Sequence, residues 1–275
     1  MNALSREIRE AKVEPGTLLF WWLGQNGFVM KSSNLTAVID PYLSTFAERV
    51  TKGTEAEHVR MSLPPMRPED VDFADVVLCT HDHADHIDPD GIPVIAKASA
   101  RVQFVVPAAA RETLLKFGIK ADRVETLKGD DSRAMDGMEV FGIPAKHERF
   151  DYHPQTGFPY LSYVMRLEGK SVFHAGDTIP YGGQVERVRK HRVDLALVPI
   201  NGRDDFRHKL NFEGNFDCRE AVTFCLGIGA KLTVPMHYDL FTLNTADVNE
   251  FRTMAEDRGL RCHVMAGVGA RVEVR

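Results

Sequence analysis

Short apolar runs separated by turn residues recur along the whole chain. Strands that are buried on both faces read as continuous apolar runs, so these runs predict the strands of a layered domain. The turns 24–27 and 168–170 are typical of hairpins that join neighbouring strands. The runs with strand character are 17–23, 28–31, 36–39, 76–79, 102–106, 124–127, 138–143, 161–167, 171–174, 195–200, 231–234, 261–265 and 271–274.

Helical segments are fewer, and each half of the chain is dominated by strands before helices join them. No internal repeat or low-complexity linker divides the 275 residues. The pattern predicts an α/β domain in which helices cover strands, and we treat residues 1–275 as one domain. The predicted helices are 5–12, 91–98, 108–117, 185–191, 218–226 and 246–257.

One long segment, residues 44–70, lacks a clear period and is interrupted by Gly and Pro. Irregular segments of this length inside a compact domain are uncommon and are often lids or binding loops. The segment carries Arg49, Lys52, Arg60 and Arg67. These side chains either contact an anionic substrate or form a solvated face.

The densest chemistry lies in Thr80–His86, directly after the apolar run 76–79. This stretch reads THDHADH and holds three histidines and two aspartates. His81 and His83 are two residues apart, so in extended backbone their side chains leave on the same side. Asp85 and His86 follow after a turn and can face a second ion. Imidazole and carboxylate are preferred ligands of zinc and also suit manganese or iron, so the stretch predicts a metal site.

Composition limits the other classes of function. The formal net charge is −5 and the isoelectric point is near 6.1, which argues against a nucleic-acid or anionic-membrane binder. The four cysteines form no CxxC pair, as expected in a reducing compartment. Residues 1–16 lack the apolar core of a signal peptide, and no apolar run approaches the ~20 residues of a membrane span. We therefore expect a cytoplasmic protein.

The motif His-x-His-x-Asp-His after a strand resembles that of the metallo-β-lactamase fold. The later residues that this family requires appear in order, each near the end of a predicted strand: His147, Asp177 in a Gly-Asp-Thr turn, and His237. The resemblance implies a four-layer αββα sandwich, with two mixed β-sheets flanked by helices. It also implies that Asp40, before Pro41, steadies the histidine loop; the alternative is a simple turn residue.

The resemblance further implies two half-sites for two divalent ions, Mn²⁺ or Zn²⁺. One ion would be held by His81, His83 and His147. The other would be held by Asp85, His86 and His237, with Asp177 bridging both. Two ions that share a water lower its pKa towards neutrality, and the resulting bridging hydroxide attacks a carbonyl carbon or a phosphorus.

Two further histidines lie near these positions. His153 could replace His147 as a ligand, could act as a catalytic proton donor, or could simply lie on the surface; we prefer His147 as the ligand because it directly follows the strand. His174 stands in a predicted strand before the Gly-Asp turn, and we expect a hydrogen-bonded wall residue there rather than a ligand.

Within the superfamily, the sequence resembles the L-ascorbate-6-phosphate lactonase family most. The resemblance rests on residues 16–24, on 80–88, on 199–204, on Asn215 and on 235–239. It implies a lactonase that acts on a phosphorylated sugar-acid lactone, manganese as the working ion, and a homo-oligomer. Arg203 would hold the anionic substrate through its guanidinium group. Asn201 and Asn215 would donate to the substrate, or would merely cap turns.

Two other functions remain open from the sequence. The same pair of ions could hydrolyse a phosphodiester of a small molecule, since the attacking group is identical. A metal-binding regulator without turnover is the alternative from another class. The complete ligand set argues against the regulator.

Overall fold

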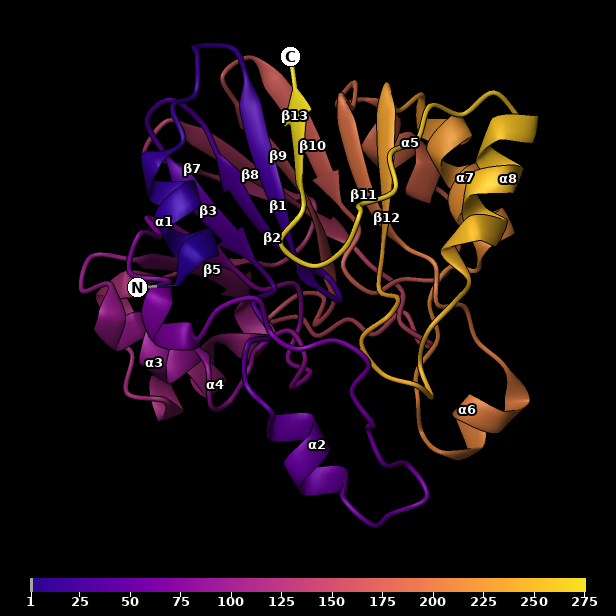
Figure 1. The fold of residues 1–275 in the computed structure, drawn as a ribbon, viewed down its shortest axis with the longest axis horizontal. Coiled ribbons are helices and arrows are strands. Elements are labelled where there is room, and N and C mark those ends of the chain that lie inside the picture. The colour runs from indigo at the N-terminus through magenta and orange to yellow at the C-terminus, as the bar shows by residue number, and fades with distance from the viewer. Residues whose placement is uncertain (1) are drawn as a thin grey trace.

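The computed structural model describes residues 2–275 and shows two β-sheets packed face to face with helices on both outer sides (Figure 1). This is the predicted αββα sandwich. The first sheet has the order β13-β1-β2-β3-β4-β5-β6. Its strands are β1 (Leu18–Gly24), β2 (Gly27–Lys31), β3 (Thr36–Ile39), β4 (Val76–Leu78), β5 (Gln103–Pro107), β6 (Val124–Leu127) and β13 (Arg271–Val274).

The second sheet has the order β12-β11-β10-β9-β8-β7 and is also mixed. Strands β10, β11 and β12 run parallel, while β7, β8, β9 and β10 pair antiparallel. The strands are β7 (Asp131–Met135), β8 (Met138–Pro144), β9 (Leu161–Leu167), β10 (Lys170–His174), β11 (Leu195–Pro199) and β12 (Leu232–Met236).

Strand β1 shows why the apolar runs are continuous. Leu18, Phe20 and Trp22 belong to the core between the two sheets, whereas Leu19 and Trp21 pack under the helices of the first sheet. Successive side chains of a strand point to opposite faces, so a strand with a core on each side needs apolar residues at every position. This accounts for the continuous apolar runs; among the predicted strands, 261–265 has no counterpart in the structure.

The helices form two outer layers, with α1, α3 and α4 over the first sheet and α5, α7 and α8 over the second (Figure 1). Two short helices, α2 and α6, stand apart from these layers near one edge of the sandwich. The bounds are α1 (Ala3–Glu10), α2 (Phe46–Thr51), α3 (Ile92–Ala98), α4 (Arg111–Lys116), α5 (Gln184–Arg189), α6 (Asp205–Lys209), α7 (Cys218–Ile228) and α8 (Val248–Asp257). Single 3₁₀ turns occupy Pro68–Asp70, Ala108–Ala110 and Ala121–Arg123.

Three local predictions need correction. Residues 44–70 are not wholly irregular, because they contain α2 and one of the 3₁₀ turns. Residues 261–265 do not form a strand; Cys262 makes one isolated β-bridge to Thr233. Strand β7 and helix α6 were not predicted.

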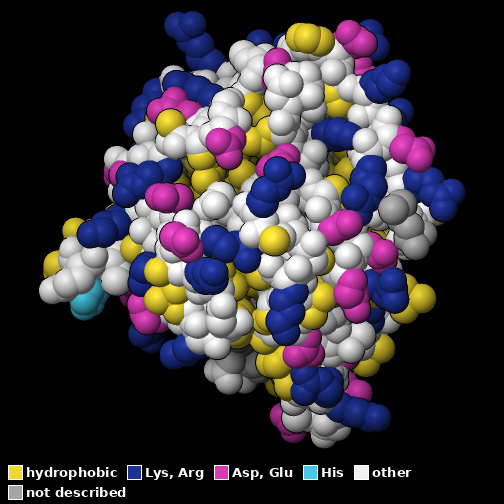
Figure 2. Space-filling view, turned by 90° about the vertical axis from the view of Figure 1, so that its left-hand side faces the viewer, with side chains coloured by type: hydrophobic (Ala, Val, Ile, Leu, Met, Phe, Trp, Pro, Cys, Tyr) yellow, Lys and Arg dark blue, Asp and Glu magenta, His cyan; other side chains and the backbone are white. Residues whose placement is uncertain are grey.

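The surface over α1, α3 and α4 carries basic and acidic side chains interspersed, without a broad patch of one sign in this view (Figure 2). Among residues 2–275, no helix has the length and apolar character that crossing a membrane requires.

Candidate metal centre

The histidine loop begins where β4 ends, and a single carboxylate fixes its start. Asp40 follows β3, which is parallel to β4, and its carboxylate accepts hydrogen bonds from the Thr80 amide and hydroxyl, both at 2.8 Å. The same carboxylate lies 2.8 Å from His86 Nδ1. Because Nδ1 then donates to Asp40, Nε2 of His86 is left to face the site. The structure thus places Asp40 where the resemblance expected it.

Three strands of the second sheet bring the other side chains to the same edge. His147 lies three residues after β8, Asp177 three residues after β10, and His237 directly after β12. Gly176 makes the approach of Asp177 possible: it has φ +57°, and a Cβ there would lie 2.8 Å from the Thr80 side chain. His237 itself has φ +61°, in the left-handed region that non-glycine residues adopt infrequently.

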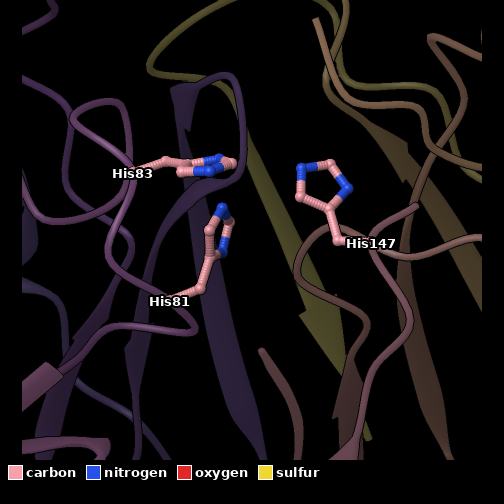
Figure 3. A group of neighbouring side chains, drawn as sticks. All are labelled: His81, His83 and His147. Atoms are coloured by element: carbon pink, nitrogen blue, oxygen red, sulfur yellow. The ribbon is translucent and has the colours of Figure 1, made fainter. Parts of the chain in front are cut away.

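The first pocket is lined by His81, His83 and His147, each of which offers one nitrogen within 4.8 Å of the others. His81 and His83 come from the loop after β4, and His147 faces them from the second sheet (Figure 3). His147 Nδ1 lies 3.0 Å from the Gly214 carbonyl oxygen, to which it donates. Nε2 of His147 is therefore the nitrogen available to the pocket.

The second pocket is formed by Asp85, His86 and His237, again with one donor atom each within 4.8 Å. Asp177 lies between the pockets. Its Oδ1 is 3.5 Å from His86 Nε2, and its Oδ2 is 3.4 Å from His237 Nε2 and 3.7 Å from His147 Nε2. The seven side chains predicted as ligands therefore converge, with Asp177 placed to reach both pockets.

The atoms that face the pockets fit divalent metal ions. Nε2 of His81 and Nε2 of His86 are buried and have no hydrogen-bond partner among the described residues. A buried polar atom without a partner is costly, and a metal ion would satisfy both nitrogens. Imidazole nitrogens with carboxylate oxygens are a donor set for zinc, manganese or iron.

Burial and neighbouring charges favour the metal-binding forms of Asp177 and His81 but the protonated form of His86. Burial alone would raise the pKa of Asp177, yet His237 and His86 hold it well below its usual range. Burial, His86 and His83 lower the pKa of His81 far below its ordinary value. Burial also opposes protonation of His86, but Asp177, Asp85 and Asp40 raise its pKa well above the usual value. An ion entering the second pocket would therefore displace a proton from His86.

Sequence reasoning missed three side chains at the centre: Gln25, Asn26 and Glu213. Gln25 Nε2 lies 3.0 Å from Asp85 Oδ2 and 3.1 Å from His237 Nε2. Asn26 Nδ2 donates to Asp177 Oδ1 at 2.6 Å. Both residues form the β1–β2 turn, which the sequence identified only as a hairpin. The signal was their polarity in a turn whose flanking strands are apolar throughout.

Glu213 lies beside the first pocket, with Oε2 at 3.3 Å from His147 Nε2 and 3.6 Å from His83 Nε2. It stands in the loop between α6 and α7, far from every ligand motif in sequence. No sequence pattern indicated this position.

Two of the expected residues are not brought to the cluster. His153 is exposed, lies in a small turn closed by backbone hydrogen bonds to Gly157, and belongs to none of the metal-binding groups among residues 2–275. Its expected proton-donor role gains no support. Arg203 makes two 2.7 Å hydrogen bonds to the Glu220 carboxylate and one of 2.9 Å to the Asn215 carbonyl. Its guanidinium is occupied within the protein, which argues against the substrate role expected for it.

The structure also bears on His174, on Asn201 and Asn215, and on the cationic side chains of residues 44–70. His174 is a hydrogen-bonded wall residue, as predicted: its Nε2 contacts the Asn26 carbonyl and its Nδ1 accepts from the Gly176 amide. Asn201 and Asn215 are buried, and the choice between substrate contact and turn capping stays open. Of the four cationic residues in 44–70, Arg49, Arg60 and Arg67 are paired with carboxylates. Contact between this segment and a substrate stays a prediction.

A sandwich of two mixed sheets with a histidine–aspartate cluster at one edge defines a metallo-β-lactamase fold. The comparisons agree. The family model described as a beta-lactamase superfamily domain matches residues 36–238, and the chain belongs to this superfamily.

Individual relatives are distant. A probable L-ascorbate-6-phosphate lactonase of Escherichia coli O139:H28 is 23% identical over 92% of this chain and 78% of its own length. A metallo hydrolase of Ignicoccus hospitalis is 22% identical and has a TM-score of 0.69 over 94% of this chain and 99% of its own. An isothiocyanate hydrolase from Delia radicum gut bacteria is 15% identical, with a TM-score of 0.70 over 92% and 98%. The fold is shared by proteins of different substrates, so the site must decide the function.

Proposed function

We propose that this protein is a metal-dependent hydrolase that opens a lactone, or a related ester, of a sugar acid. The observation that carries the proposal is the convergence of seven donor side chains into two pockets that share Asp177. The similarity to a probable L-ascorbate-6-phosphate lactonase over most of the chain supports the lactone as the substrate class.

The residues divide the work as follows. His81, His83 and His147 would together hold one divalent ion. Asp85, His86 and His237 would together hold a second. Such ions, when bound, supply Lewis acidity that polarises a carbonyl group and lowers the pKa of water. Asn26 fixes the Asp177 carboxylate through its 2.6 Å hydrogen bond, and Gln25 Nε2 donates to Asp85 at 3.0 Å. These contacts hold the ligand atoms in place before an ion binds.

Recognition of the substrate involves Asn201 and Asn215 in this proposal. Oδ1 of Asn201 and both polar side-chain atoms of Asn215 are buried without a hydrogen-bond partner among residues 2–275. Polar atoms in this state are suited to a ligand's hydroxyl or carbonyl group. Because Arg203 is paired with Glu220, a phosphate on the substrate has to be bound by other groups, and an unphosphorylated lactone becomes an equal candidate.

The first test compares three substrates: L-ascorbate 6-phosphate, an unphosphorylated sugar lactone and bis-p-nitrophenyl phosphate. Enzyme reconstituted with Mn²⁺ or Zn²⁺ should hydrolyse a lactone, and Asp177→Asn should lower kcat/KM at least ~100-fold because both pockets lose a charged ligand. The control is Asp151→Asn, which removes a carboxylate charge from an exposed side chain outside the metal-binding groups.

Metal content measured alongside should be about two ions per chain and should fall in His83→Ala. Hydrolysis of the phosphodiester alone would replace the lactonase by a small-molecule phosphodiesterase. No bound ion after reconstitution would refute the hydrolase.

A further inference from the structure

We propose that Glu213 is an additional metal ligand, which binds the ion of the His81, His83 and His147 pocket. The inference rests on the proposed function, since it concerns the same metal centre. Glu213 lies on the pocket's solvent side, where its side chain is 36% exposed. Its Oε2 faces the Nε2 atoms of His83 and His147, and Nε2 of His147 is the nitrogen left free for a metal.

The distances are those of ligands that share one ion. Donor atoms about 2.1 Å from an ion at tetrahedral corners lie about 3.4 Å from one another. Glu213 Oε2 lies 3.3 Å from one nitrogen and 3.6 Å from the other. A surface ion pair would not require Oε2 to lie beside both nitrogens that point into the pocket.

The loop that carries Glu213 is fixed to the pocket at the next residue. The Gly214 carbonyl accepts from His147 Nδ1, and its amide donates to Glu148 Oε1 at 2.9 Å. A Cβ on Gly214 would lie 2.5 Å from the Cβ of Arg203, so only glycine fits between Arg203 and the loop. This gives Arg203 a role in positioning: held by Glu220, it clamps the loop and also binds the Asn215 carbonyl.

Tyr160 holds the carboxylate from the other side. Its hydroxyl lies 3.4 Å from Glu213 Oε2, and its ring centroid lies 5.2–5.7 Å from those of His81, His83 and His147. Tyr160 therefore helps to orient Glu213 beside His83 and His147.

A second carboxylate beside the shared Asp177 changes which ion the pocket prefers. Three imidazoles with one shared carboxylate suit zinc, whereas a further carboxylate oxygen is a hard donor that favours manganese or Fe²⁺. The negative charge also offsets the second positive charge of a divalent ion. Glu213 would thus shift the selectivity of the centre away from zinc.

The test measures metal affinity without any substrate. Chelator-treated wild type, Glu213→Gln and Asp151→Asn are titrated with Mn²⁺ and with Zn²⁺ by calorimetry. We expect Glu213→Gln to raise the Mn²⁺ dissociation constant of one of two sites at least ~10-fold and the Zn²⁺ constant by less. Asp151→Asn removes the same charge from an exposed side chain near Tyr160 that belongs to none of the metal-binding groups, so both constants should stay within about twofold of wild type.

Each outcome decides the inference. Unchanged constants for both ions in Glu213→Gln would overturn it and leave the two-ion hydrolase intact. An equal loss in Asp151→Asn would also overturn it, because a general field effect would then explain the result. Wild type that binds neither ion would overturn both the inference and the proposed function. Equal unfolding midpoints of the metal-free proteins confirm that Glu213→Gln folds normally.

Discussion

At the scale of single residues, Asp40 connects the fold to the metal centre. It is completely buried, has φ +43°, and its two oxygens serve Thr80 and His86. Few residues accept this backbone conformation, but asparagine does so readily. Asp40→Asn therefore changes charge and hydrogen bonding while it preserves the backbone.

We expect Asp40→Asn to weaken metal binding about 10–100-fold and to cost about 1–3 kcal/mol of stability. An amide has one accepting oxygen, which cannot serve the Thr80 amide in addition to the Thr80 hydroxyl and His86 Nδ1, so a buried donor loses its partner. Competition with a chelator measures the affinity, and urea unfolding of the metal-free protein measures the stability. Wild-type affinity in this variant would show that Asp40 is a simple turn residue.

The ligand residues could be predicted from sequence, whereas several of their neighbours could not. His81, His83, Asp85 and His86 are adjacent in sequence, so their local spacing already carries the chemistry. Glu213 reaches the pocket only because the loop before α7 packs on His147. Arg203 was expected to bind an anion, but Glu220, on the first turn of α7, already supplies one.

At the scale of elements, the predictable strands are those with a core on both faces. Strand β7 was missed because it pairs only with β8 at the sheet edge and reads Asp-Ser-Arg-Ala-Met, mostly polar and partly exposed. Helix α6 was missed because its five residues include no buried one and show no apolar period. Residues 261–265 looked like a strand, but their pairing stops after the single bridge from Cys262 to Thr233.

The contact between α5 and the second sheet carries a pH-sensitive histidine. His191 follows α5, packs on Phe141 of β8 with centroids 4.6 Å apart, and lies 3.2 Å from Arg166 of β9. Burial, then Arg166 and Lys190, lower its pKa to about 4. The unfolded chain binds this proton near pH 6.5 and the folded protein does not. The stabilising contribution is therefore present above about pH 6.5 and is lost as pH falls towards 4.

Between pH 7.5 and pH 5, wild type should lose about 2 kcal/mol more unfolding free energy than His191→Gln, which has no proton to bind at this position. Urea unfolding of both metal-free proteins at the two pH values measures the difference. Parallel losses in the two proteins would mean that His191 titrates normally in the folded state.

At the scale of the whole molecule, the centre joins the two halves of the sandwich. His81, His83, Asp85 and His86 extend from the first sheet, while the remaining ligands extend from the second. Without an ion, the two sheets meet at this edge through unpartnered nitrogens and a buried carboxylate. Bound ions would replace these unfavourable contacts by bonds that span both sheets. Metal binding should therefore stabilise the folded chain against unfolding.

We accordingly expect Mn²⁺ or Zn²⁺ to raise the Tm of the chelator-treated protein by at least ~5 °C, and the Tm to keep rising with the logarithm of the free ion concentration. Thermal unfolding followed by circular dichroism measures this, with His83→Ala as the matched variant. The His83 side chain is 39% exposed, so the variant should unfold near the wild-type temperature without metal and respond less to added metal. A Tm that does not change with either ion would mean that no ion links the sheets. The convergence of histidines and aspartates would then require another explanation.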